Sequence, residues 1–462
     1  MCYHIHTGII RVFRKEAHSM KIYSTYSVKI KHYNSIFKNT ISVYRHAVDY
    51  LITVCLNEWK ILSLIDGSLL RQQFVERLCH STKDNPSPRY PDFDMKFYKM
   101  PSYMRRSAIN EAIGKVSSYM GNLSNWMKNP VGSRPSYPKA GFIYPAMYRT
   151  VMYDQTGKYT AKIKVYIRNT WDWINIELKK SDMDYICRRC NERKQCAPTL
   201  QKRGKEWFLD FPFEEKVKLS NTSVHDQTFV AVDLGINTAA TVSVMRPDGT
   251  ILGRHFCSLK RETDHLRHSI NRIKKAQQHG NRKMPRLWAK AKGINRDIAT
   301  KTANFIIETA VLYNADAVVF EHLDRKGKAR GSKKQRLKLW RSQEVQSIVT
   351  NKAHRLGMHI SIVNAWGTSK LAYDGSGYVL RGRDGGFNTY ELCKFQNGKT
   401  YNCDLSASYN IGARYFIREI LKSLDVNSRL LIEAKVPQCS KRSTSTLSTL
   451  INLNAELMSL AA

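Results

Sequence analysis

The chain has 462 residues, enough for two to four domains, and its 42% of hydrophobic residues can supply several cores. Lysine and arginine outnumber aspartate and glutamate by 75 to 38, and the net charge of +37 favours a polyanionic partner over a small substrate. No apolar run approaches the roughly 18 residues of a membrane span and no signal-peptide pattern is present, so we expect an intracellular protein without a membrane partner.

The amino-terminal part is predicted to contain one strand followed by helices. Residues 1–20 show no clear period and are treated as an extension, and Met20 is an alternative start of the protein. Residues 21–34 begin with the alternation of a strand, and residues 35–128 are predicted to be helical, with amphipathic stretches at 35–62 and 104–126. The second stretch has a basic side, which on the residues alone reads as a solvated face. Its basic residues are Arg105, Arg106 and Lys115.

Residues 129–222 differ in character from the helical part. They contain several prolines and short alternating runs, such as 160–168 and 171–178. This pattern predicts a small β-barrel.

Three short apolar runs in the second half each carry one carboxylate. Asp233 and Glu321 end β-branched runs and should lie at the ends of buried strands, and Asp404 precedes a predicted helix start. Because an unpaired buried carboxylate is costly, a cation is its natural partner. Oxygen ligands favour Mg²⁺ or Mn²⁺. The three acids therefore predict one divalent-metal site.

The elements around these acids indicate a fold for the second half. Strands at 229–233, 241–245 and 251–256 precede a long helical region, the strand that ends at Glu321, a helix, a strand at 359–363 and the helix after Asp404. This is the element order of a ribonuclease-H-like nuclease. An actin-like ATPase would need a second Asp-x-Gly loop and a glycine-rich adenosine segment, which the sequence lacks at the expected places.

Two further stretches of this half are strongly basic. The helical region 260–300 is either a solvated face or the wall of a nucleic-acid channel. Lys326 to Lys338 reads as a loop suited to contact a strand or to gate the site. The candidate contacts in the helical region include Arg267, Arg272, Lys274 and Lys275.

The three acids, with Gly235 after the first and Asn410 after the third, resemble the split RuvC domain of TnpB and the compact type V CRISPR effectors. The resemblance implies a multidomain α+β protein with a RuvC (RNase H-like) α/β domain that is split in sequence. A helical REC-like domain and a β-barrel WED-like domain accompany it. In the family the helical region holds the guide–target duplex, so the resemblance makes Arg105, Arg106 and Lys115 candidate phosphate contacts. Asp233, Glu321 and Asp404 would then be catalytic and hold two Mg²⁺ ions about 3.5–4 Å apart.

The resemblance also sets the predicted domain boundaries. They are 1–20 for the extension, 21–34 and 129–222 for the WED-like barrel, 35–128 for the REC-like domain, 223–367 and 401–425 for RuvC, 368–400 for an insert and 426–462 for a disordered tail. TnpB proteins usually carry a zinc ribbon in the insert, but here only Cys393 and nearby Cys403 remain. Elsewhere Cys187, Cys190 and Cys196 lack a fourth ligand, and structural zinc normally has four. We expect no zinc, and we expect the insert to contact DNA through Lys370, Arg381 and Arg383.

The predicted function is an RNA-guided DNA endonuclease that cuts guide-matched double-stranded DNA beside a short motif. Its partners would be a guide RNA and target DNA, with a monomeric protein in a prokaryotic cytoplasm near the nucleoid. Two alternatives remain at this point: a guided DNA-binding repressor without cleavage, and a guide-independent, transposon-associated nuclease. The sequence does not decide whether the guide derives from a transposon end or a CRISPR array.

Overall fold

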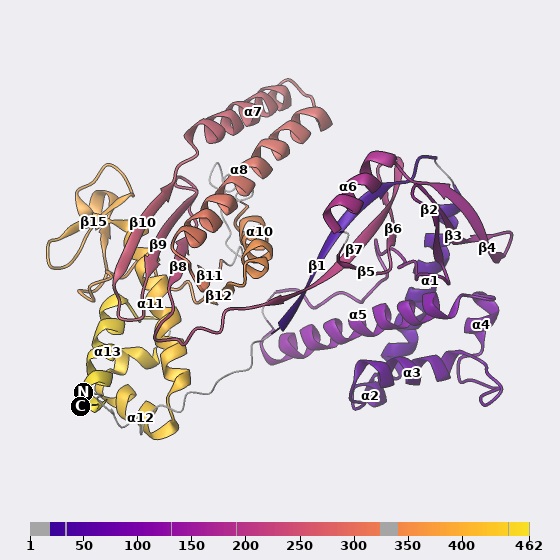
Figure 1. Cartoon of the computed structure of the whole chain (residues 1–462), viewed down its shortest axis with the longest axis horizontal. Helices are drawn as coiled ribbons and strands as arrows, with labels where there is room; N and C mark the ends of the chain where they lie inside the picture. Colours follow the sequence, from indigo (N-terminus) through magenta and orange to yellow (C-terminus); the bar gives the residue numbers. More distant parts are fainter. Residues whose placement is uncertain are drawn as a thin grey trace. The chain divides into compact units, whose positions relative to one another are not determined.

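The structure, a computed structural model, describes residues 19–32, 35–130, 132–190, 192–323, 341–441 and 443–461. It divides into two compact units, Tyr23–Glu215 and Lys216–Ala462, the latter joined by the residues up to Ile22 (Figure 1). Of the predicted extension only Ser19 and Met20 are described, and they begin the first strand. The basic loop Lys326 to Lys338 lies outside the described residues.

The unit Tyr23–Glu215 contains two open sheets. The strand predicted near residue 21 pairs with the last strand of this region, as expected. One sheet has the order β1-β7-β5, with β6 also on β7, and the other has the order β2-β3-β4. The strands are β1 (Ser19–Lys29), β2 (Tyr153–Gly157), β3 (Thr160–Ile167), β4 (Thr170–Glu177), β5 (Lys194–Gln195), β6 (Thr199–Arg203) and β7 (Glu206–Lys218).

The predicted barrel does not close in the described residues, so this prediction was wrong. The alternating runs do form strands, but a helix covers their apolar face: the hydroxyl of Thr40 on α1 accepts a hydrogen bond from the backbone N–H of Tyr166 on β3 at 3.0 Å. In the described residues, an isolated antiparallel bridge between Ile30 and Leu178 connects the two sheets near β1 and β4. Alternation reports that one face of a strand is buried, not which element buries it.

Both predicted amphipathic stretches are helical. The first lies in α1 and α2, the second in α5, and α1 packs against α5 through a buried core with Tyr44, Val48 and Ile109. The Tyr44 hydroxyl also lies 3.1 Å from the hydroxyl of Ser107. The helices of this unit are α1 (Ile36–Asn57), α2 (Trp59–Leu62), α3 (Ser68–Cys79), α4 (Asp92–Lys96), α5 (Ser102–Lys128) and α6 (Lys180–Cys190).

The unit Lys216–Ala462 is built around a five-stranded sheet of order β10-β9-β8-β11-β12 (Figure 1). Neighbours in β10-β9-β8 are antiparallel, and β11 is parallel to both β8 and β12. This arrangement confirms the predicted meander and the predicted central strands. The strands are β8 (Phe229–Asp233), β9 (Ala240–Met245), β10 (Ile251–Cys257), β11 (Ala317–Glu321) and β12 (His359–Val363).

Helices cover both faces of this sheet. Along β8, Phe229 and Ala231 share a core with α11, whereas Val230 and Val232 share one with α8 and α10. Burial on both faces explains why the strands are nearly continuous apolar runs. The helices are α7 (Lys260–Gln278), α8 (Pro285–Leu312), α10 (Ser342–Arg355), α11 (Cys403–Ser423), α12 (Val426–Lys435) and α13 (Leu447–Ala461), with 3₁₀ turns η1 (Gly382–Gly385) and η2 (Pro437–Ser440).

The predicted insert forms a small sheet of order β13-β14-β15. Its strands are β13 (Leu380–Arg381), β14 (Leu392–Lys394) and β15 (Thr400–Asn402). Cys393 and Cys403 are buried with Ala372 and Phe395 in an apolar cluster of the insert. None of the helices in the described part of the chain has the length and apolar character needed to cross a bilayer.

The carboxy-terminal segment is ordered, which corrects the prediction that 426–462 is disordered. Its described residues form α12, η2 and α13. Leu447, Leu450 and Leu453 recur every three residues and are buried in the core that α11 shares with β8. The serine and threonine content suggested disorder, but three leucines on one side of a helix are enough to dock it on a neighbour.

Candidate active site

Two of the three predicted acids lie at the ends of adjacent parallel strands. Phe320 pairs with Val232 in the register of β11 and β8, so Glu321 and Asp233 are the next residues at the same edge of the sheet. Asp404 is the second residue of α11, which packs over β8. All three side chains are half-buried and therefore still open to solvent.

Local sequence determines the backbone conformation beside two of the acids, Asp233 and Asp404. A Cβ atom on Gly235 would lie 2.5 Å from the backbone oxygen of Thr238, so only glycine fits this turn two residues after Asp233. The side chain of Asn402 caps α11 by accepting a hydrogen bond from the backbone N–H of Leu405 at 2.9 Å. This cap sets the first turn of α11, which carries Asp404.

The negative charges of Glu321 and Asp404 act on Asp233. Burial raises the pKa of Asp233 well above its usual range, and the negative charges of Glu321 and Asp404 raise it further, whereas Arg381 lowers it. Burial also raises the pKa of Glu321 and the pKa of Asp404, and Arg381 opposes the shift at Asp404. The sheet and α11 thus gather three segments that are distant in sequence into one negative cluster.

Two other side chains complete this cluster. The hydroxyl of Thr368 donates its proton to Glu321 Oε2, the nearer of two acceptors at 2.8 Å, and the backbone oxygen of Ala365 lies 3.0 Å from the same hydroxyl. Arg381, from β13 of the insert, is half-buried, and its buried Nε has no hydrogen-bond partner among the described residues. The sequence placed Arg381 among DNA contacts, and the structure places its charge beside Asp233 and Asp404.

The three carboxylates are suitable ligands for a hard cation, but they are not arranged as a complete binding site for one. Carboxylate oxygens are the ligands of Mg²⁺ and Mn²⁺, and a cation would relieve the repulsion that raises these pKa values. In the part of the chain that the structure describes, no three histidine, cysteine or acidic side chains are arranged as ligands of a single ion.

Two buried polar residues of α11 contact the loop that carries Thr368. Sequence reasoning missed Arg414, and it named Asn410 only as part of the family resemblance. Asn410 is fully buried and Arg414 is 5% exposed, and both lie on α11. The charge of Arg414 lowers the pKa of Glu321. The sequence did contain a signal for this pair. Two polar residues four apart lie on the same side of a helix, and on an otherwise apolar side they are expected to have buried hydrogen-bond partners.

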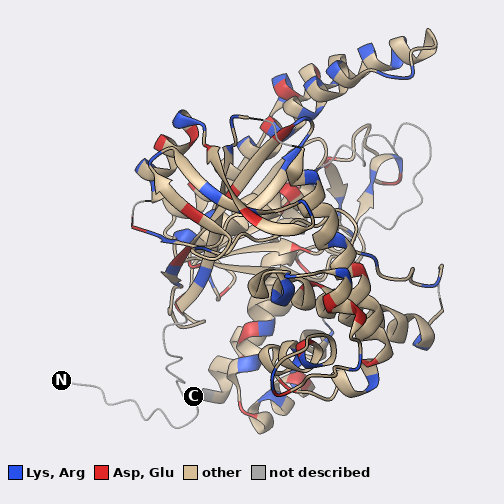
Figure 2. Cartoon of the chain, turned by 90° about the vertical axis from the view of Figure 1, so that its right-hand side faces the viewer, with Lys and Arg blue, Asp and Glu red and all other residues tan. Residues whose placement is uncertain are grey.

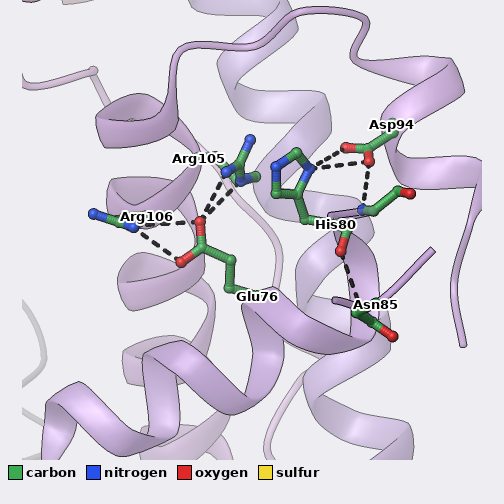
Figure 3. Close-up of polar contacts among 7 residues, drawn as sticks. Glu76, His80, Asn85, Asp94, Arg105 and Arg106 are labelled. Atoms are coloured by element: carbon green, nitrogen blue, oxygen red, sulfur yellow. Dashed lines mark hydrogen bonds and ion pairs between the residues drawn. The ribbon is translucent and has the colours of Figure 1, made fainter. Parts of the chain in front are cut away.

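Arg105 corrects a predicted nucleic-acid contact (Figure 3). It is 7% exposed, and its guanidinium donates two hydrogen bonds to Glu76 Oε1, from Nη2 at 2.9 Å and from Nε at 3.1 Å. Its neighbour Arg106 is more exposed but also pairs with Glu76, at 3.1 Å. Glu76 lies on α3 and both arginines lie on α5, so these ion pairs join the two helices. Arg105 is therefore a structural residue.

The other predicted contacts lie on accessible surfaces, and their role stays a prediction. Lys115 is half-buried and pairs with Glu111 at 3.4 Å. Arg267 is exposed and lies 3.8 Å from Asp264. Figure 2 shows lysine and arginine over much of the chain. The remaining predicted contacts are all exposed: Arg272, Lys274, Lys275, Lys370 and Arg383.

Two family models match separate parts of the chain. The model described as the Aq_aa04 family matches residues 24–167, and the model described as a probable transposase matches residues 211–330. The first range lies inside the unit Tyr23–Glu215, and the second lies almost entirely in the other unit. The transposase range includes Asp233 and Glu321.

Two relatives from Aquifex aeolicus (strain VF5) resemble the chain. It is 42% identical over 82 residues to the uncharacterized protein aq_aa04, a match that covers 17% of this chain and 44% of that protein. It is 27% identical over 237 residues to the TnpB-like protein aq_aa05, covering 46% of this chain and 74% of that protein. The chain thus spans less than half the length of the first relative. The predicted resemblance to TnpB is confirmed by the second relative and by the transposase model.

Solved type V effectors are also similar. One is Cas12f1 in complex with sgRNA and target DNA, with 15% identity, coverage of 84% of this chain and 98% of that chain, and a TM-score of 0.32. Another is Alicyclobacillus acidoterrestris C2c1 in complex with single-guide RNA, with 10% identity, coverage of 82% and 66%, and a TM-score of 0.39. At these TM-scores the likenesses decide neither the fold nor the partners of this chain.

Proposed function

We propose that this chain, which resembles TnpB, is a metal-dependent, RNA-guided DNA endonuclease of the TnpB and compact type V kind. The observation that carries the proposal is the cluster of Asp233, Glu321 and Asp404. Three distant segments bring these acids to one sheet edge, where the charges of the other two raise the pKa of Asp233. We assign residues 223–367 and 401–425 to a RuvC domain, with REC-like and WED-like parts before them.

In this proposal the three carboxylates hold Mg²⁺, or Mn²⁺, as two ions. The metal would supply an activated water and neutralise charge that develops on the phosphate. Thr368 orients Glu321 through its 2.8 Å hydrogen bond. Arg381 would contact the scissile phosphate, because its positive charge acts on both Asp233 and Asp404 and the phosphate would lie beside the same two acids.

The proposed partners are one guide RNA and target double-stranded DNA on a monomeric protein in the cytoplasm. A net charge of +37 exceeds what one duplex footprint needs, so a structured RNA would cover much of the surface. The exposed lysines and arginines of α7 would contact nucleic-acid backbone. The guide would read the sequence, and the protein would read a short flanking motif.

Alanine substitutions at the three acids test the site. Asp233→Ala, Glu321→Ala and Asp404→Ala should each lower plasmid cleavage about 1,000-fold, the equivalent of about 4 kcal/mol of lost metal stabilisation. Guided DNA binding should persist, because removing a negative charge does not weaken a basic channel. Asp297→Ala, which changes an exposed acid on α8, is the matched control and should cut normally. Cleavage retained by any of the three variants would refute this assignment of the site.

A further inference from the structure

Asn410 and Arg414 form a buried polar pair on one side of α11. They are four residues apart, so their side chains emerge from the same face of the helix. Burial lowers the pKa of Arg414 to about 10, and the charge of Glu321 opposes this shift. A buried guanidinium is costly unless its donors are used. The N–H groups of Arg414 are therefore expected to have hydrogen-bond acceptors inside the protein.

Arg414 donates to four backbone carbonyl groups from two separate segments. Its Nη1 donates to the oxygens of Asn364 at 2.7 Å and Trp366 at 2.9 Å. Its Nε donates to the oxygen of Ser445 at 3.1 Å, and its Nη2 to that of Ser443 at 2.7 Å. One side chain therefore joins the loop after β12 to the segment before α13.

Asn410 joins the same two segments one turn earlier. Its Nδ2 donates to the backbone oxygens of Thr368 at 3.0 Å and Leu371 at 2.9 Å. Its Oδ1 accepts a hydrogen bond from the backbone N–H of Leu447 at 3.3 Å. Loop 364–371 is thus held at four carbonyl groups by α11, and the loop carries the Thr368 hydroxyl that contacts Glu321.

The α13 segment is anchored at two further places. The side chain of Asn454 donates to the backbone oxygen of Pro247, in the turn between β9 and β10, at 2.8 Å. The backbone N–H of Ser448 donates to the backbone oxygen of Tyr373, at the start of the insert, at 2.9 Å. The position of α13 is therefore fixed by the sheet, the insert and α11 together.

We propose that Asn410 and Arg414 are positioning residues that couple residues 443–461 to Glu321 through loop 364–371 and Thr368. On this account the carboxy-terminal segment supports the nuclease centre. It supplies two of the four carbonyl groups to which Arg414 donates, and these bonds keep Arg414 in place to hold loop 364–371. The proposal rests on the proposed function for its effect on cleavage. The coupling itself is a property of the folded chain.

Arg414→Lys isolates the positioning role from the charge. Lysine keeps the positive charge near Glu321, but its single ammonium group cannot donate to two segments in the fixed directions of a guanidinium. Thr368→Val removes the hydroxyl at the other end of the coupling with little change in volume. The matched control is Arg418→Lys on the same helix, since Arg418 is half-buried and donates to Ser361 Oγ at 2.6 Å and not to loop 364–371.

The experiment measures Mn²⁺ binding to the guide-loaded protein by calorimetry, together with plasmid cleavage and target-DNA binding. Arg414→Lys and Thr368→Val should each weaken Mn²⁺ binding and cleavage about 10- to 100-fold, as other changes to groups that orient metal ligands do. Target binding should not change, and Arg418→Lys should stay within about twofold of the original chain. The double variant Thr368→Val with Arg414→Lys should be no worse than the more impaired single variant, because both act through one contact.

Hydrogen exchange of the metal-free protein provides a readout that does not depend on catalysis. Backbone amides of loop 364–371 should exchange faster in Arg414→Lys and in a chain that ends after Lys441, and not in Arg418→Lys. Unchanged exchange in Arg414→Lys, or Mn²⁺ binding and cleavage within about twofold of the original chain, would overturn the proposal. If the original chain neither cuts nor binds Mn²⁺, the proposed function fails, and exchange alone then decides whether the coupling exists.

Discussion

Gly412 lies where α11 packs tightly against two strands of the central sheet, β8 and β9. A Cβ atom there would lie 2.9 Å from Phe229 Cε2 and 2.5 Å from Met245 Sδ. Methionine can move, but Phe229 is fully buried, with its ring centroid 4.1 Å from that of Phe416. Overpacking of this kind costs about 1–3 kcal/mol, and alanine regains about 1 kcal/mol of helix propensity. Gly412→Ala should therefore lower the free energy of unfolding by up to about 2 kcal/mol.

Gly293 provides a matched control for this substitution. It lies within α8 in the same unit, and no atom lies within 4 Å of the Cβ that alanine would add. Gly293→Ala should stabilise the protein by up to about 1 kcal/mol. Urea denaturation of both variants measures the difference, and cleavage should fall only in Gly412→Ala, because α11 carries Asp404. Equal stabilisation by both substitutions would refute the described packing of α11 on β8.

Three further predictions concern stability. Burial and neighbouring acids raise the pKa of Asp233 above its ordinary value of 3.8. The folded state therefore binds more protons than the unfolded state, and the stability of the protein falls as pH rises from 3.8 through the raised pKa. Asp233→Asn should stabilise the metal-free protein at neutral pH in urea denaturation, and a lower stability would contradict the pKa shift. Leu450→Ala should cost about 2–5 kcal/mol in the same assay, and a loss under about 1 kcal/mol would show that α13 is not docked. Glu76→Ala should cost about 3 kcal/mol or more because it leaves buried Arg105 without its partner, and a neutral result in thermal denaturation would restore Arg105 as a candidate phosphate contact.

The central sheet and two of the acids could be predicted from sequence because their signals are local. A β-branched run buried on both faces reads as a strand wherever it pairs, and an acid at its end stays at the edge of the sheet. Asp233 and Glu321 therefore needed only the element order. The position of Asp404 followed from a helix start beside it, which its Asn402 cap produces.

The errors came from partners that are remote in sequence. Alternation in 160–167 showed that one face is buried but not that α1 covers it, so a barrel was predicted where two open sheets form. Arg105, Arg106 and Lys115 are all basic residues of one amphipathic stretch, so the sequence does not distinguish a buried one from an exposed one. The fold places Glu76 beside Arg105, and this pairing makes Arg105 a structural residue. The role of residues 443–447 depends on backbone groups: Arg414 donates to the carbonyl groups of Ser443 and Ser445, and the N–H of Leu447 donates to Asn410. Every residue has such backbone groups, so the sequence does not show which of them are used.

The central claim is that an RNA guide directs cleavage by the cluster of three acids. The direct measurement is cleavage of plasmid DNA by RNase-treated protein, with and without a guide matching the plasmid, over a library of flanking sequences and with Asp233→Ala as the control. The account predicts cutting only with the matching guide, only beside a particular short motif, and not by the variant. Equal cutting with and without the guide would contradict it and indicate a guide-independent nuclease, whereas guided binding without any cutting by the original chain would indicate a repressor.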